Sequence, residues 1–211
     1  MSDLLKKILI VIPFFLLVIE IVNARFGYLL HNELKVTPIL NIFLNTVPLF
    51  IFVLFDVLTR KQESTFQMVI QASFYIYVMS VFYLTLFPMS LENFLTNTFW
   101  LRSINLEPFN IFRDYHFFDS QIVGNFIMLF PLGIYLHFLY RKFTTKVSSL
   151  VFIFFVSFSI EVFQLVFSAG STDIDDIMLN TVGGYLGYWC FKVSSTIYHK
   201  KSDKTFNALI K

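Results

Sequence analysis

The sequence predicts an all-α integral membrane protein, a bundle of about six transmembrane helices with both termini cytoplasmic and a long outer loop between helices three and four. Of the 211 residues, 56% are hydrophobic and only 14% are charged, and a soluble domain of this size could not bury so much apolar surface. The apolar residues come in runs of about 20, the length that crosses a bilayer. The net charge of +2 is small and the basic residues lie between these runs. We therefore expect a multi-pass protein of the cell membrane whose partners are lipids, with no nucleic acid.

Six runs are long and apolar enough to span. They are Leu4 to Val22, Ile39 to Leu58, Phe66 to Phe87, Ile122 to Tyr140, Val147 to Phe167 and Asp175 to Val193. The first lacks a small-residue cleavage site and is expected to remain as an anchor. Pro13, Pro48 and Pro131 lie in or near spans, where neighbouring helices can satisfy the carbonyls that proline frees. A single integral membrane domain over residues 1–211 accounts for this pattern.

The distribution of Lys and Arg predicts the orientation, because cytoplasmic segments carry the excess of these residues. With the N-terminus inside, 12 of the 16 are cytoplasmic: Lys6, Lys7, Arg60, Lys61, Arg141, Lys142, Lys146, Lys192, Lys200, Lys201, Lys204 and Lys211. The outer segments hold the other four, Arg25, Lys35, Arg102 and Arg113. The Ser168–Ile174 turn and the Pro88–Gln121 loop then both face outward, and the polar ends of helices four, five and six meet at one leaflet.

The stretch from Ser159 to Gly187 is the most informative, because carboxylates in an apolar span are costly and mark a functional site. We expect its turn at Ser168–Ser171 to form the lip of a membrane-embedded polar site. The candidate ligand-binding residues are Asn105, Arg113, Asn125, Glu161, Gln164, Asp173, Asp175, Asp176 and Asn180. Glu161 and Asp176 are also the candidates for a catalytic role.

Each acid has a structural alternative. Asp173 is placed to cap helix six, with Asp176 as an acidic capping-box analogue, and both suit the positive end of the helix. Glu161 and Gln164 lie at i and i+3 on one face of helix five, one turn after Ser157, and could meet Asn125 or Asn180. Glu161 is alternatively a protonated or hydrogen-bonded carboxyl that holds helices together. Three Asp could bind a hard cation, but the spacing matches no calcium loop, so no metal or cofactor is predicted.

Helix six is expected to lie centrally in the bundle. Asp176, Asn180 and the glycines Gly183, Gly184 and Gly187 share one face at helical spacing. Gly183 and Gly187 form a GxxxG pair, which allows close helix contact in lipid. The single cysteine, Cys190, lies in an apolar run and is interpreted as a small packing residue.

The outer loop supplies the remaining candidates. Its middle, Asn93 to Ile104, mixes aromatic and polar residues and suits a segment at the membrane interface, with Trp100 at headgroup depth. Arg113 is the candidate counter-charge for the Asp cluster, or a bidentate ligand for a phosphate-bearing lipid headgroup. His116 is a candidate proton carrier, although a lone loop histidine is more often incidental.

Four motifs in order resemble the VanZ-like family of bacterial membrane proteins, which is named for a teicoplanin-resistance protein. They are Asn105-Leu106-Glu107-Pro108-Phe109, Gly124-Asn125-Phe126 through Phe130-Pro131-Leu132-Gly133, Glu161-Val162-Phe163-Gln164, and Asp173-Ile174-Asp175-Asp176 through Gly184. The resemblance covers about 83–189, with 1–82 as additional N-terminal helices and 194–211 as a basic cytoplasmic tail. Two positions depart from the family pattern. Many members have Arg just ahead of the Asp motif, where this chain has Ser171-Thr172, and an apolar residue where Glu107 stands.

The resemblance implies a role in glycopeptide susceptibility or in handling cell-envelope lipids and precursors, without a settled reaction. The first hypothesis is that an outward polar pocket engages an anionic lipid, a cell-wall precursor or a lipoglycopeptide. An intramembrane enzyme acting on a phospholipid or polyprenyl-phosphate carrier is an alternative, with Glu161 as acid or base and the Asp cluster orienting the headgroup. A transporter or scrambler is a third possibility, disfavoured because no inverted repeat is evident.

Overall fold

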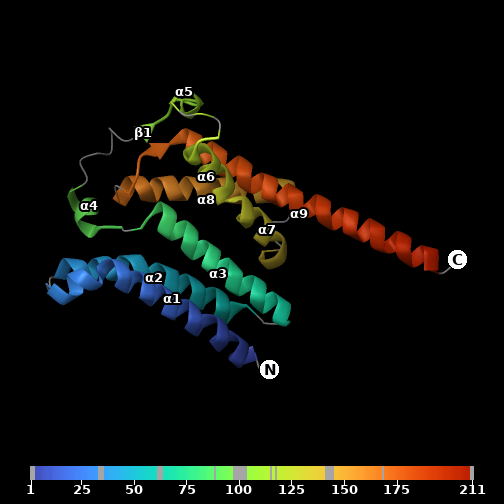
Figure 1. The fold of residues 1–211 in the computed structure, drawn as a ribbon, viewed down its shortest axis with the longest axis horizontal. Helices are drawn as coiled ribbons and strands as arrows, with labels where there is room; N and C mark the ends of the chain where they lie inside the picture. Colours follow the sequence, from blue (N-terminus) through green and yellow to red (C-terminus); the bar gives the residue numbers. More distant parts are fainter. Residues whose placement is uncertain are drawn as a thin grey trace. The chain divides into compact units, whose positions relative to one another are not determined.

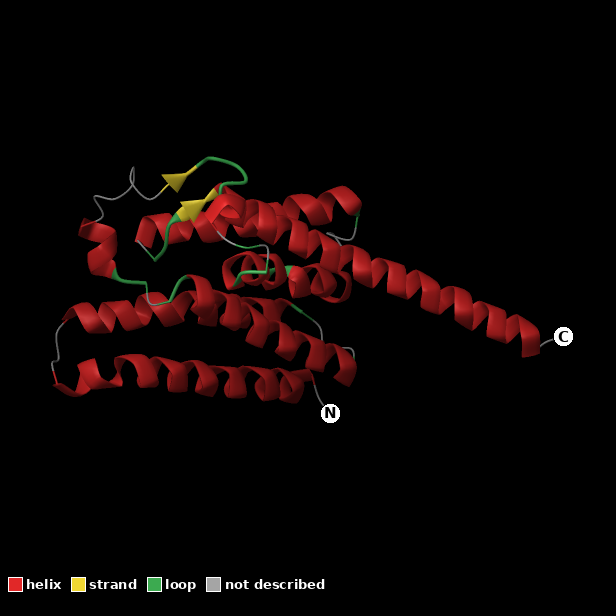
Figure 2. Cartoon of the chain, turned by 45° about the horizontal axis from the view of Figure 1, so that its top comes forward, coloured by secondary structure: helices red, strands yellow, loops and turns green. Residues whose placement is uncertain are grey.

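The structure is a computed structural model that describes residues 3–32, 36–60, 64–87, 89–96, 104–114, 116, 118–140, 145–167 and 169–209. Most of these residues are helical (Figures 1 and 2). The elements in chain order are α1 (Asp3–Asn32), α2 (Val36–Thr59), α3 (Thr65–Thr85), α4 (Leu91–Thr96), β1 (Ile104–Asn105), α5 (Ile111–Asp114), α6 (Ser120–Met128), α7 (Phe130–Leu139), α8 (Lys146–Phe167), β2 (Thr172–Asp173) and α9 (Ile174–Leu209). The two strands form one small sheet. Trp100 and most of the predicted interfacial segment lie outside the described residues.

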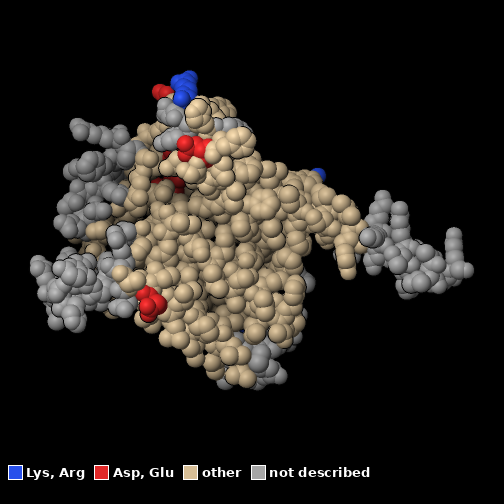
Figure 3. Space-filling view, in the orientation of Figure 1, with Lys and Arg blue, Asp and Glu red and all other residues tan. Residues whose placement is uncertain are grey.

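Four helical stretches within the described ranges are long and apolar enough to cross a membrane: Ile39–Thr59, Thr65–Thr85, Ser120–Leu139 and Lys146–Phe167. They correspond to the second to fifth predicted spans. The other two predicted spans fall in α1 and α9, and their crossing of the membrane stays a prediction. Large apolar side chains are exposed along these helices, including Phe55, Leu84 and Phe155. On the face in Figure 3, charged groups of the described residues occupy only a few spots, as suits contact with lipid.

The fourth predicted span differs from the expected single helix. It is interrupted at Leu129, which separates α6 from α7. Pro131 lies in the first turn of α7. Proline has no N–H to donate and its ring clashes with the preceding turn, so it is tolerated at the start of a helix and not inside one. The capping carboxylate of Asp119 fixes the other end of α6 by accepting the Gln121 N–H at 3.2 Å.

The chain divides into two compact units, of which the first comprises Met1–Asn105 and Ile160–Thr172. Its core contains one apolar stripe from each long helix: Ile10, Phe14 and Val18 of α1, Leu49, Val53 and Val57 of α2, and Phe74, Tyr75 and Met79 of α3. The four-residue spacing in α1 and α2 places each stripe on one helix face. A polar cluster lies beside these stripes, because the Asp56 carboxylate accepts from the Tyr75 hydroxyl at 2.7 Å and from Arg60 at 2.8 Å.

The second unit comprises Leu106–Ser159 and Asp173–Lys211, and α9 packs against α6 and α7 at its centre. Glycines allow this close packing. A Cβ added at Gly183 would overlap the carbonyl oxygen of Phe126, and one at Gly187 would overlap that of Phe130. A Cβ at Gly184 would lie 2.6 Å from the Ile153 side chain of α8 and 3.1 Å from the carbonyl oxygen of Leu129. The glycine face therefore lets the backbone of α9 pack directly against the backbones of α6 and α7.

Candidate binding site at the amino-terminal end of α9

The three aspartates at the start of α9 have three different partners. Asp173 caps the helix by accepting the Asp175 N–H at 2.9 Å, the role that its place ahead of the helix predicts. Asp175 is only 2% exposed. The Asp176 carboxylate contacts Asn125 of α6. An acid at each of these positions also interacts favourably with the positive end of the helix. The cluster is therefore divided among separate contacts rather than gathered around one point.

Asp175 holds the turn that precedes α5. Its Oδ1 accepts the backbone N–H of Phe109 at 2.6 Å, and its Oδ2 accepts that of Ile111 at 2.9 Å. Phe109 has a φ of 67°, a left-handed conformation that costs a non-glycine residue about 1–3 kcal/mol. Two hydrogen bonds to a carboxylate are strong enough to offset that cost. Asp175 thus joins the Pro108-Phe109 motif to the Asp motif as a structural clamp.

Asp176 pairs with an amide of another motif. Asn125 of α6 donates its Nδ2 hydrogen to Asp176 Oδ1. This contact ties the α6 motif to the Asp motif in the same way that Asp175 ties the loop. Three of the four motifs that are separated in sequence therefore meet at one end of the second unit.

Asn180 lies one turn further along α9. It is fully buried, and neither of its side-chain polar atoms has a hydrogen-bond partner among the described residues. The Thr181 hydroxyl beside it is likewise buried and unpartnered within that part of the chain. Nearby, Ser157 of α8 donates to the Ile177 carbonyl at 3.3 Å. A buried amide normally has hydrogen-bond partners. Asn180 has none among the described residues, so its donor and acceptor are both uncommitted in the interior of this unit.

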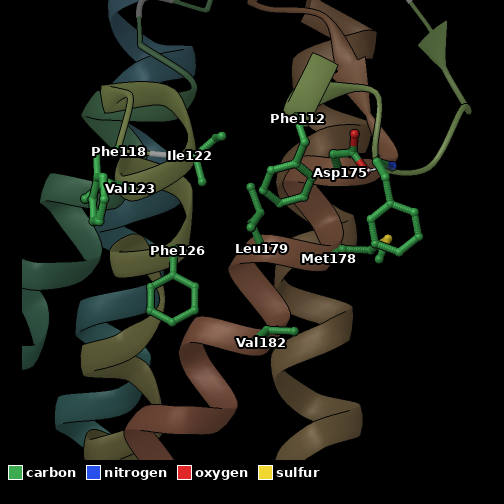
Figure 4. A pocket seen from close by; sticks show the side chains of 10 residues that line it. Phe112, Phe118, Ile122, Val123, Phe126, Asp175, Met178, Leu179 and Val182 are labelled. Carbon is green, nitrogen blue, oxygen red and sulfur yellow. Dashed lines mark hydrogen bonds between the residues drawn. The ribbon is translucent and has the colours of Figure 1, made fainter. Parts of the chain in front are cut away.

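A cavity of about 420 Å³ lies between the start of α9, α6 and the turn around α5 (Figure 4). Figure 4 shows the α6 side chains facing those of α9 and Phe112 across it. The lining residues are Phe109, Phe112, Phe118, Ile122, Val123, Phe126, Asp175, Met178, Leu179 and Val182. Nine of these ten are apolar, and the single acid already accepts two N–H groups. The rings of Phe109 and Phe112 stack with centroids 6.5 Å apart. This cavity can hold an apolar group of ligand size.

The remaining sequence-predicted residues lie elsewhere. Glu161 and Gln164 belong to the first unit, where Glu161 is buried and Gln164 donates to the Thr85 carbonyl at 3.1 Å. The Glu161 carbonyl accepts the Thr172 hydroxyl at 3.2 Å. Asn105 is half-buried in β1, and Arg113 is exposed in α5. A common site of Glu161 with Asn125 and Asn180 stays a prediction.

Sequence reasoning missed two polar features. The buried Asp56 was not singled out, although an acid inside the second span and Arg60 four residues later signal an ion pair. Asn45 was also missed: this buried amide donates to the Met89 carbonyl and accepts the Met89 N–H, at 2.8 and 2.9 Å. The cavity as a whole had no sequence signal, because its residues come from three segments and all except Asp175 are apolar residues that attract no notice individually.

The fold and this site define a helical protein with helices long and apolar enough to cross a membrane. Three of its sequence motifs meet at the amino-terminal end of α9. The sequence profile of the VanZ/LLP1 family matches residues 74–195, more than half of the chain, and the chain belongs to this family. It is 28% identical over 130 residues to Protein VanZ of Enterococcus faecium, which covers 61% of this chain and 78% of that protein. No solved structure matches. The resemblance to the VanZ-like family that the four motifs indicate is confirmed. The matched region extends beyond both ends of the expected region, 83–189.

Proposed function

We propose that the chain is a VanZ-like protein of the cell membrane that lowers susceptibility to the lipid-bearing glycopeptide teicoplanin by engaging an amphiphile of the outer leaflet. The ligand would be an envelope lipid, a lipid-linked cell-wall precursor or the drug itself. The amino-terminal end of α9 would be the binding site. The outward direction of this end is part of the proposal and follows from the 12 cytoplasmic Lys and Arg against four outer ones.

One observation carries the proposal. The Pro108-Phe109 turn, Asn125 and the Asp motif are joined by side-chain hydrogen bonds at one place, beside a cavity. These are also the residues on which the family resemblance rests. A purely structural function of the motifs would not need a cavity of ligand size at their meeting point.

Susceptibility testing would examine the proposal directly. The full chain would be expressed in a susceptible Gram-positive host, and minimal inhibitory concentrations of teicoplanin and vancomycin would be compared with an empty-vector strain. We expect the teicoplanin value to rise and the vancomycin value to stay the same, because vancomycin has no acyl chain. The variant Asn125→Ala should lose the effect. A matched variant at an exposed position of α8, Val151→Ala, should keep it. Unchanged susceptibility to both drugs, with the protein present in the membrane, would refute the proposal.

A further inference from the structure

The cavity between α5, α6 and α9 has a chemistry that restricts its ligand. None of the described residues that line it is Lys or Arg, and the Asp175 carboxylate is committed to the N–H groups of Phe109 and Ile111. A polar or charged group placed inside would therefore lose its hydration without gaining partners, which is costly. A hydrocarbon group placed there loses only contact with water or lipid and gains packing against aromatic walls.

The rim of the cavity is open and aromatic. Phe118 is 87% exposed and Val182 is 51% exposed although both line the cavity. The exposure of these two lining side chains indicates that the cavity opens to the surroundings at this rim. Arg113, the next residue after the lining residue Phe112, is exposed.

From this arrangement we infer that the cavity binds one hydrocarbon chain of an amphiphile whose polar headgroup remains outside. The inference rests on the proposed function, since it names the chemistry of the ligand at the same site. The chain could belong to a bilayer lipid or to an acylated glycopeptide, and these sources share the same apolar group. The apolar walls recognise the hydrocarbon chain and make no demand on the structure of the headgroup.

Native mass spectrometry of the delipidated full-length protein would test the inference. The probes are palmitoyl lysophosphatidylglycerol and, as a chainless control, glycerol phosphate. We expect a single retained lysolipid per protein and no retention of glycerol phosphate. Leu179→Trp and Val123→Trp fill the cavity from its two walls and should lower lysolipid affinity by about tenfold or more, because displacing even two methylene groups has an effect of that size.

Controls separate a cavity effect from general damage. Val151→Trp adds the same ring at a position of α8 that is 46% exposed, and it should retain lysolipid like the wild type. Leu179→Ala enlarges the cavity and should shift the preference from palmitoyl towards stearoyl chains, which keeps the test decisive if the tryptophan variants do not fold. Equal retention by the wild type and both folded tryptophan variants would overturn the inference. An unchanged chain-length preference in Leu179→Ala would overturn it as well.

Competition distinguishes the two sources of the chain. Displacement of lysolipid by teicoplanin and not by vancomycin would assign the cavity to the drug, whereas displacement by neither would assign it to bilayer lipid. Both results support a hydrocarbon site. The binding readout is independent of drug susceptibility, so retained lysolipid with unchanged susceptibility would refute the proposed function and leave the cavity assignment intact.

Discussion

Asp175 Oδ1 accepts the backbone N–H of Phe109 at 2.6 Å across 66 residues of sequence. This contact, with its partner at Ile111, fixes an irregular turn against the first turn of a long helix. The turn then supplies two of the aromatic walls of the neighbouring cavity. A carboxylate that looks like a ligand in the sequence therefore acts by holding the wall of the site.

Replacing Asp175 should loosen this turn. Asp175→Ala leaves two buried or half-buried backbone N–H groups without their acceptor and removes what offsets the left-handed φ of Phe109. We expect a loss of about 2–4 kcal/mol of unfolding free energy. Thermal unfolding in detergent and limited proteolysis between residues 106 and 111 would measure it. A variant as stable and as protease-resistant as the wild type would contradict the clamp.

The pair of Asn125 and Asp176 should behave as one energetic unit. Asn125→Ala and Asp176→Ala each remove one partner, so the double variant should be less destabilised than the sum of the two. The expected coupling is about 0.5–3 kcal/mol. A double-mutant cycle from unfolding free energies provides the measurement. Strict additivity would show that the hydrogen bond contributes nothing to stability.

Glycine positions offer a sharp comparison. Gly183→Ala should destabilise by at least about 1 kcal/mol, because its Cβ overlaps the Phe126 carbonyl and the helices must separate. Gly124→Ala has open space within 4 Å and should be neutral or stabilising by up to about 1 kcal/mol, since alanine favours the helix. Melting temperatures of the two purified variants would decide, and the opposite order would contradict the packing.

The Asp56 cluster should contribute to the stability of the first unit. Asp56→Ala leaves Arg60, Gln71 and Tyr75 without the carboxylate that they share, and we expect a cost of about 3 kcal/mol or more. Glu20→Ala, at an exposed acid of α1, should change stability by less than about 0.5 kcal/mol. Equal stability of the two variants would show that the buried cluster is energetically unimportant.

The sequence allowed prediction of the helices that follow a simple apolar pattern, of the Asp173 cap and of the family. Hydropathy predicts such helices because a segment that crosses a bilayer needs a long apolar run. The Asp173 cap is predictable because capping depends only on the spacing of nearby residues. The partners of Asp175 were not predictable, because backbone N–H groups of an irregular turn leave no mark in the residue pattern. The break at Leu129 was signalled by Pro131 but hidden by uniform hydrophobicity on both sides. The cavity depends on the relative placement of three segments, which no local pattern encodes.

The orientation of the turn before α9 tests the account most directly, because a site for an outer-leaflet ligand must face outward. In a Cys190→Ala background, Ala169→Cys would be treated on intact cells with a membrane-impermeant maleimide, and Thr145→Cys would serve as the cytoplasmic control. We predict that Ala169→Cys is labelled on intact cells and that Thr145→Cys is labelled only after lysis. Labelling of Ala169→Cys only after lysis would contradict the topology and the proposed site together.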